Sequence, residues 1–201
     1  MELLLPRACA GCRHPGAVLC RECQESLREV PQRVYRTSLI GVPVFSLGAY
    51  SELRRNIIIA MKEYNNRAVR PYVGAVVHAG LRYLIARGDI PDDVVLVPAP
   101  TRAKSASVRG GDPVLHVCQA TGMNVENCVR IFRGAADQST LSAEARRDNM
   151  RRSVELFTPV VKAPLILIDD VMTTGSTLSA TVEVLRGAGA EVAGALVFAD
   201  V

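Results

Sequence analysis

Aromatic residues are scarce in this chain: tryptophan is absent, and the aromatic content is only 4%. Proteins that hold single-stranded nucleic acid by base stacking need exposed aromatic side chains. The sequence therefore supplies a stacking surface poorly, and we expect any affinity for DNA to be mostly electrostatic and to fall steeply with added salt.

Long apolar runs and nucleotide-binding signatures are missing as well. No stretch of 18 apolar residues occurs, so we expect no transmembrane helix and no membrane insertion. The chain starts MELLLPRACA, with a run of three leucines and no basic segment before it, so we expect no signal peptide and a cytoplasmic location. The motif GxxxxGK[ST] is absent, which disfavours a P-loop nucleotide hydrolase.

The bulk composition is that of an ordinary globular protein. The chain has 201 residues, of which 49% are hydrophobic and 22% are charged. This length allows one α/β domain with a real core and a small appendage. The formal net charge of +4 is mild and does not by itself indicate a nucleic-acid partner.

Four of the six cysteines form two CxxC pairs near the N-terminus: Cys9, Cys12, Cys20 and Cys23. In a reducing cytosol such pairs favour a metal site over disulfides, and four thiolates suit tetrahedral Zn²⁺. We predict a structural zinc site; an iron–sulfur cluster and redox-active thiols are the alternatives. Four protein ligands leave no open position for catalysis by zinc. The remaining Cys118 and Cys128 lie in apolar surroundings and are expected to be buried.

Apolar strand patterns alternate with amphipathic helix patterns after the cysteine segment. Strands are predicted at 42–50, 94–97, 128–132, 165–169 and 192–198, and helices at 51–64, 71–87, 113–121, 142–152 and 176–187. This alternation predicts an α/β fold whose mainly parallel sheet is covered by helices on both faces. We expect a zinc-binding segment over 1–35 and an α/β domain over 36–201.

The stretch LILIDDVMTTGSTLSA at 165–180 carries the most informative chemistry. An apolar strand runs into Asp169 and Asp170, and a loop with a glycine and hydroxyl residues then enters a helix. Backbone N–H groups at a helix start, together with hydroxyl side chains, make a cradle for a phosphate monoester. Carboxylates accept hydrogen bonds from vicinal hydroxyls and can hold hydrated Mg²⁺. Together they predict a ribose 5-phosphate ligand; a phospho-acceptor pocket or a plain helix N-cap are the alternatives.

This stretch resembles the motif by which type I phosphoribosyltransferases bind phosphoribosyl diphosphate (PRPP). Together with the two CxxC pairs, it makes the chain similar to the ComF family, phosphoribosyltransferase-like proteins linked in some bacteria to competence and DNA uptake. Three further segments resemble that family: the Lys-Tyr-containing segment MKEYNNR (61–67), the pyrophosphate loop and Arg-Gly signature at 97–112, and QSTLSAEARRDNM (138–150). The chain has RGGD at 109–112 where the family commonly has Arg-Gly-Phe-Asn.

The resemblance implies a type I phosphoribosyltransferase-like fold and a role for each segment. The catalytic pair Asp169 and Asp170 would hold the ribose hydroxyls and Mg²⁺. The 5-phosphate would be held by Thr173, Thr174, Gly175, Ser176 and Thr177. The loop under the pyrophosphate would be Pro98, Ala99, Pro100 and Thr101, with the cations Arg102, Lys104 and Arg109 beside it. The small polar segment 133–142, with Gln138, would be either a lid over the substrate or an ordinary surface loop.

Three functions follow from this resemblance. In the first, a nucleophile, usually a ring nitrogen of a base, displaces pyrophosphate from C1 of PRPP; the acceptor base cannot be identified, and no general base stands in the motif. In the second, a non-catalytic protein binds PRPP or single-stranded DNA and assists DNA uptake. In the third, the zinc segment docks onto DNA-uptake proteins without contacting nucleic acid.

Overall fold

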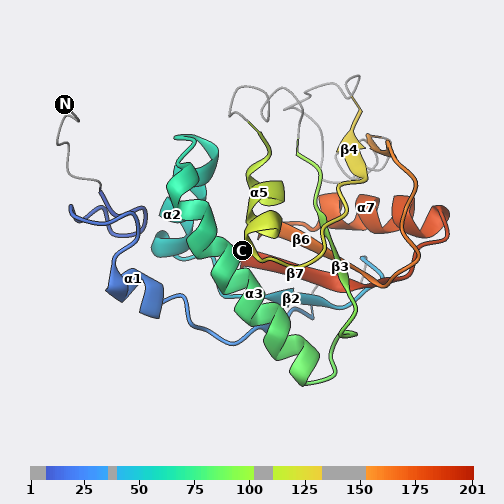
Figure 1. Ribbon diagram of the computed structural model, residues 1–201, viewed down its shortest axis with the longest axis horizontal. Coiled ribbons are helices and arrows are strands. Elements are labelled where there is room, and N and C mark those ends of the chain that lie inside the picture. The colour runs from blue at the N-terminus through green and yellow to red at the C-terminus, as the bar shows by residue number, and fades with distance from the viewer. Residues whose placement is uncertain (1–7, 36–39, 102–110, 133–152) are drawn as a thin grey trace.

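The computed structural model describes residues 8–35, 40–101, 111–132 and 153–201 (Figure 1). The predicted helix at 142–152, the segment 133–142 and the cations Arg102, Lys104 and Arg109 lie outside these residues. In chain order the elements are α1 (Arg21–Glu25), β1 (Gln32–Arg33), β2 (Val44–Ser46), α2 (Glu52–Lys62), the 3-10 helix η1 (Arg67–Val69), α3 (Arg70–Ala86), β3 (Val95–Pro98), α5 (Pro113–Ala120), β4 (Val129–Ile131), β5 (Val154–Leu156), β6 (Leu165–Met172), α7 (Ser176–Gly187) and β7 (Val192–Asp200).

In the described part of the chain, the main sheet has five strands in the order β1-β2-β7-β6-β3. Every neighbouring pair is parallel except the antiparallel pair of β1 and β2 at one edge. Strand β6, which lies between β7 and β3, begins with four residues, Leu165–Ile168, that are almost completely buried. A strand that is apolar on both faces is typical of a sheet covered on both sides. The prediction of a mainly parallel α/β fold is therefore confirmed.

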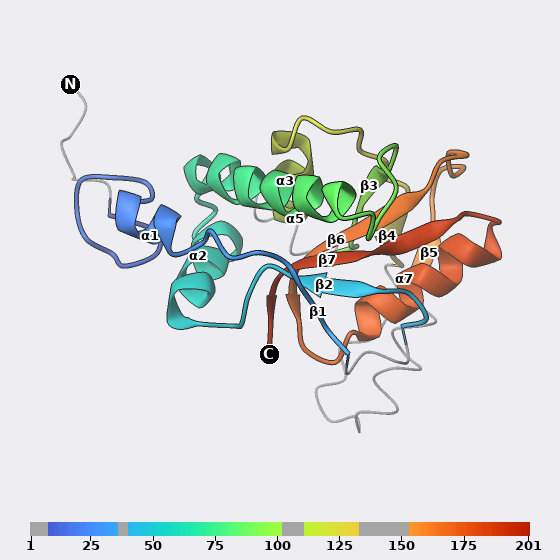
Figure 2. The same cartoon turned by 90° about the horizontal axis from the view of Figure 1, so that it is seen from below.

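Helices cover both faces of the sheet, as Figure 2 shows. Helices α2, α3 and α5 lie on one face, where Ile166 and Ile168 of β6 join a large apolar cluster that we call the α3-side core. Helix α7 lies on the other face, where Leu165 and Leu167 pack with Leu178 in the α7-side core. Successive side chains of a strand point to opposite faces of the sheet, so β6 contributes apolar side chains to both cores.

Two strand predictions differ from the structure, and two short strands were not predicted. Strand β6 continues through Met172, because β7 is long enough to pair with it as far as Asp200. The acidic pair, Asp169 (predicted as the last strand residue) and Asp170 (predicted just after it), therefore lies within the strand. Strand β4 pairs with β5 in a separate antiparallel ribbon and is not part of the main sheet. The two-residue β1 and the three-residue β5 are too short for their alternation to stand out in the sequence.

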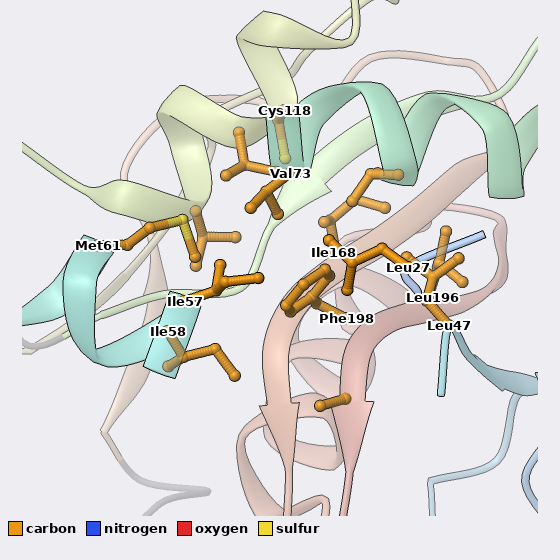
Figure 3. Packing of buried hydrophobic residues seen from close by; sticks show 14 of the residues in the cluster. Leu27, Leu47, Ile57, Ile58, Met61, Val73, Cys118, Ile168, Leu196 and Phe198 are labelled. Carbon is orange, nitrogen blue, oxygen red and sulfur yellow. The ribbon is translucent and has the colours of Figure 1, made fainter. Parts of the chain in front are cut away.

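The cysteine segment packs onto the rest of the fold and shares its core. Cys9, Leu19, Cys23 and Leu27 all belong to the α3-side core, and Figure 3 shows Leu27 within it. The contact with α2 is polar as well as apolar: the Asn56 amide donates a hydrogen bond of 2.9 Å to the Gly11 carbonyl. The segment therefore contributes buried apolar surface to the fold, in addition to its four thiols.

Arg54 is a charged side chain buried at the junction of three segments. Its Nη1 lies 3.0 Å from the carboxylate of Glu29, its Nη2 donates to the Leu47 carbonyl, and its Nε donates to the Phe198 carbonyl. The guanidinium also stands 5.7 Å from the centre of the Phe198 ring. A single side chain of α2 thus ties the N-terminal segment to the ends of β2 and β7.

Replacing Arg54 with methionine is expected to lower the free energy of unfolding by about 2–3 kcal/mol, because two buried carbonyls lose their donors. Glu29 is half exposed and can be solvated, so its loss of a partner adds little. The exposed neighbour Arg55 provides the matched control, Arg55→Met. Urea unfolding followed by circular dichroism measures both; equal midpoints for the two variants would contradict the assigned role of Arg54.

Among the described residues, no helix has both the length and the apolar content needed to cross a bilayer.

Candidate functional site

The carboxyl ends of the parallel strands bring two predicted loops side by side. Pro98 of β3 pairs with Ile168 of β6, and the Ala99 N–H donates 2.8 Å to the Ile168 carbonyl. The segment 98–101 therefore leaves the sheet directly beside the acidic pair. In open α/β sheets, ligands bind outside the carboxyl ends of the strands. Within the described part of the chain, the residues predicted to bind PRPP thus gather at one edge, whereas the four cysteines lie elsewhere.

Both carboxylates of the acidic pair bond to the backbone that follows them. Asp169 Oδ1 accepts a hydrogen bond of 2.8 Å from the Asp170 N–H, and Asp170 Oδ1 accepts one of 2.7 Å from the Val171 N–H. Asp170 is buried, whereas Asp169 is half-buried. Each carboxylate is thereby fixed in orientation, which a binding site for ribose hydroxyls requires.

Lys62 contacts the acidic pair, although it was not predicted as a site residue. It is the last residue of α2, and its Nζ lies 2.6 Å from Asp170 Oδ2. The sequence contained one signal, the similarity of MKEYNNR to the Lys-Tyr segment of ComF proteins. Spacing alone could not have found this pair, because 107 residues separate the two side chains and only the packing of α2 on the sheet joins them.

The pKa of Asp169 differs from that of an ordinary aspartate. Burial raises the pKa of Asp169 well above its usual value of 3.8, and the neighbouring charge of Asp170 raises it further; the ammonium of Lys62 opposes both effects only in part. The folded protein therefore holds a proton on Asp169 more tightly than the unfolded chain does. The ionised form of Asp169 costs folding free energy.

A pH dependence of stability follows from this shift. For a carboxyl group whose pKa is raised by folding, the folded state binds more protons, so stability falls as pH rises above the unfolded value of about 3.8. We expect Asp169→Asn to remove this loss. The melting temperature of the wild type should therefore fall relative to that of Asp169→Asn between about pH 4 and pH 7. Thermal unfolding across this range measures the difference, and parallel curves would contradict the raised pKa.

The predicted phosphate loop has the backbone of an anion cradle. Gly175 has φ of 71°, a left-handed conformation that glycine adopts without strain, and a Cβ there would lie only 2.6 Å from Ile40 Cδ1. No side chain caps the start of α7 at this glycine. The hydroxyls of Thr174 and Ser176 lie 2.7 Å apart, on an exposed turn. The loop therefore presents hydroxyls and the N-terminus of a twelve-residue helix at the same edge as Asp170.

The end of the RGGD segment also has a structural role. Asp112 caps α5, accepting hydrogen bonds from the Val114 and Leu115 N–H groups, and it accepts one from the Thr101 hydroxyl. Aspartate and asparagine are equally good N-cap residues, so the aspartate keeps the capping chemistry of the asparagine found in the ComF signature. Thr101 is thereby tied to the start of α5, which holds the loop at 98–101.

A second basic group lies near this loop. Arg70 is buried and donates 2.8 Å to Asn65 Oδ1, and its Nη1 lies 2.5 Å from His116 Nδ1. Burial lowers the pKa of His116, and the charges of Arg70 and Arg67 lower it further, so the imidazole accepts from the guanidinium. These residues were not predicted as site residues, because single arginines and histidines on helices carry no distinctive pattern.

The four predicted cysteine ligands converge at the other end of α2. Their Sγ atoms all lie within 4.8 Å of one another, and those of Cys12 and Cys20 are 3.7 Å apart. A tetrahedral zinc with Zn–S bonds of about 2.3 Å places its sulfurs about 3.8 Å apart, so the arrangement fits zinc. Cys118 and Cys128 are buried, as predicted.

The thiol environment also favours a metal. Burial alone would raise the pKa of Cys9, but the N–H groups of Cys20, Cys12 and Gly11 point at its sulfur and lower the pKa to about 6. Burial raises the pKa of Cys23, and the neighbouring thiols raise it further. A divalent cation would compensate the charge of the clustered thiolates that these backbone donors only partly stabilise.

Comparison with known proteins gives partial relatives. No protein-family model matches the chain. It is 31% identical over 107 residues to the DNA utilization protein YhgH of Salmonella typhi, covering 50% of this chain and 46% of that protein. It is 40% identical over 58 residues to YhgH of Escherichia coli O157:H7, covering 29% of this chain and 26% of that protein. The matches thus span about half or less of each relative's length.

A solved structure of a phosphoribosyltransferase shows a weak similarity. The hypoxanthine phosphoribosyltransferase of Staphylococcus aureus has a TM-score of 0.35 and 11% identity, over 67% of this chain and 61% of that one. A similarity of this size does not assign a fold or a function. What the comparisons establish is that the chain is similar in part to proteins named for DNA utilization.

Proposed function

We propose that this chain binds PRPP together with Mg²⁺ and transfers its phosphoribosyl group to an acceptor base with release of pyrophosphate. The single observation that carries the proposal is the arrangement at the end of β6. Two oriented carboxylates, Asp169 and Asp170, are followed within five residues by Gly175 at the open N-terminus of α7. One ligand that carries a diol and a phosphate a few ångströms apart satisfies both parts.

The donor set suits a hard divalent cation. Carboxylate oxygens are the ligands that Mg²⁺ prefers, and Asp169 and Asp170 would hold it with the ribose hydroxyls. When bound, Mg²⁺ would stabilise the negative charge that develops on the leaving pyrophosphate. The loop from Pro98 to Thr101, held by Asp112, would lie under the pyrophosphate. The 5-phosphate would lie against Thr173–Thr177.

The proposed transfer balances without an external oxidant or reductant. The bond between C1 and the pyrophosphate oxygen breaks, and its electron pair leaves with the pyrophosphate. A ring nitrogen of the acceptor supplies the electron pair for the new bond to C1 and loses its proton to solvent. The carboxylates at 169 and 170 would fix the sugar while positive charge develops at C1, an interaction that is strongest in the transition state.

Isothermal titration calorimetry with PRPP and Mg²⁺ tests the binding part of the proposal. Product analysis with a panel of nucleobases then tests the transfer. Binding with release of pyrophosphate supports a phosphoribosyltransferase, and binding without turnover supports a protein that only senses or carries PRPP. No heat of binding at millimolar PRPP would end the proposal.

A second candidate function is binding of single-stranded DNA, favoured by the names of the relatives. Five aromatic side chains are exposed in the described structure, Tyr35, Tyr50, Tyr64, Phe132 and Phe157, so the few aromatics are placed largely on the surface. Arg130 stands 5.6 Å from the centre of the Phe157 ring. We expect affinity for a single-stranded oligonucleotide to fall at least tenfold between about 50 and 200 mM salt, as measured by fluorescence anisotropy. Affinity that hardly changes with salt would contradict an electrostatic mode.

A further inference from the structure

The ion pair between Lys62 and Asp170 blocks the carboxylate that the proposed ligand needs. Asp170 Oδ1 is already bonded to the Val171 N–H, so Oδ2 is the oxygen left for a cation or a hydroxyl. That oxygen lies 2.6 Å from Lys62 Nζ. The side chain of Asp170 is only 7% exposed, so a divalent cation cannot approach Oδ2 while the ammonium stays in place.

An ion pair of this kind is a poor choice for stability alone. Removing two charges from water costs several kcal/mol per ion, and a well-packed apolar pair is often as stable. The cost of removing the charge from water differs between the two partners, because the Lys62 side chain is 28% exposed and the Asp170 side chain 7%. Moving the ammonium of Lys62 toward solvent therefore costs less than moving the carboxylate of Asp170, which has to be compensated where it lies. The pair is asymmetric, with a fixed anion and a movable cation.

We infer that Lys62 exchanges partners: it holds Asp170 in the free protein and moves to a phosphate oxygen of the incoming ligand, which releases the carboxylate. The inference rests on the proposed function for the identity of the ligand. Lys62 ends α2, so its flexible four-carbon stem can swing while the helix, anchored in the core by Ile57 and Met61, stays in place. No covalent step is involved.

The exchange makes binding of the divalent cation and of the anionic ligand mutually dependent. A divalent cation alone has to displace the ammonium from Asp170 without supplying an anion in its place, so it binds weakly. When a phosphate is present, the ammonium gains an anionic partner and Asp170 becomes available. Each ligand thus favours the other, as linkage requires, by a factor in the usual range of about 5–150.

Substituting Lys62 tests separately its two proposed effects, weaker binding of a divalent cation and tighter binding of the phosphate ligand. In Lys62→Met the carboxylate is free, so we expect Mn²⁺ alone to bind about tenfold more tightly than to the wild type, measured from the electron paramagnetic resonance signal of unbound Mn²⁺. PRPP titrated by calorimetry in buffer without added divalent metal should bind about tenfold more weakly, because a phosphate partner is lost. Lys162→Met is the matched control, since Lys162 is exposed on the segment that precedes β6. It should match the wild type in both titrations.

A second variant keeps the inference testable if Lys62→Met does not fold, as judged by circular dichroism. In Lys62→Arg the guanidinium can bond the carboxylate through two N–H groups, so Mn²⁺ should bind more weakly than to the wild type. The inference is overturned if Lys62→Met binds Mn²⁺ no more tightly than the wild type, or if Lys62→Arg binds it as well as the wild type. If the Mn²⁺ results hold but the wild type does not bind PRPP, the proposed function fails and the role of Lys62 in excluding cations stands.

Discussion

Replacing Asp170 with asparagine is expected to weaken binding of PRPP with Mg²⁺ by about 100-fold, or roughly 2.7 kcal/mol. The amide keeps the size of the side chain and can still accept from the Val171 N–H. What it loses is the negative charge that is paired with Lys62 and that would meet the ribose hydroxyls and the metal. Calorimetry with PRPP and Mg²⁺ measures the change directly.

The control for this variant is the same substitution at a remote aspartate. Asp93 is exposed and precedes β3, at the amino end of the strands, so Asp93→Asn should leave the affinity for PRPP unchanged. Thermal unfolding of both variants checks that lost binding does not reflect lost folding. An Asp170→Asn protein that is folded and binds PRPP like the wild type would show that the ligand does not use this carboxylate.

Removing one cysteine ligand is expected to have the largest effect on stability. Cys23→Ser should leave the protein without bound zinc and lower the free energy of unfolding by at least about 3 kcal/mol, because metal binding and folding of such a segment are coupled. For a chain of this length that corresponds to a melting temperature lower by about 6–12 °C. The loss extends into the α3-side core, since Leu19 and Leu27 are buried there beside Cys23.

Metal analysis distinguishes this effect from the ordinary cost of changing a buried thiol. The wild type should contain about one zinc per chain, by the four-ligand argument. Cys128→Ala is the matched control, because Cys128 is buried in the α7-side core, away from the four ligands, and should retain one zinc. A wild-type protein purified without zinc or iron, or a Cys23→Ser protein that keeps its zinc, would contradict the assignment.

The sequence predicted those parts of the site that lie close together along the chain. Asp169, Asp170 and the loop to Thr177 belong to one stretch whose residue types have a direct chemical meaning, so strand, loop and helix could be predicted together. The four cysteines could be predicted for the same reason, because CxxC spacing reports ligand geometry within a single turn. In both cases local spacing determines where the functional atoms lie.

The parts that depend on long-range packing were not predicted. The contact of Lys62 with Asp170 exists because α2 packs across the α3-side core and ends beside β6. The extension of β6 to Met172 depends on the length of β7, which only the pairing of the two strands reveals. Arg54 has no distinctive pattern in the sequence, yet it is buried and bonded to the carbonyls of Leu47, just after β2, and Phe198 of β7. Sequence periodicity describes one element at a time and says little about the partners of single polar residues.

Helix α2 supports both candidate sites, and this limits how the chain can be divided. Its first turns carry Leu53, which packs against the α3-side core, and Asn56, which bonds to Gly11 of the cysteine segment; its last residue is Lys62. At 1.5 Å per residue, the nine steps from Leu53 to Lys62 span only about 14 Å. A shortened protein that starts after residue 24 would uncover one end of the helix whose other end is bonded to Asp170. In such a fragment α2 would be held less firmly, and with it the position of Lys62 beside Asp170. Ligand binding should therefore be measured on the intact chain.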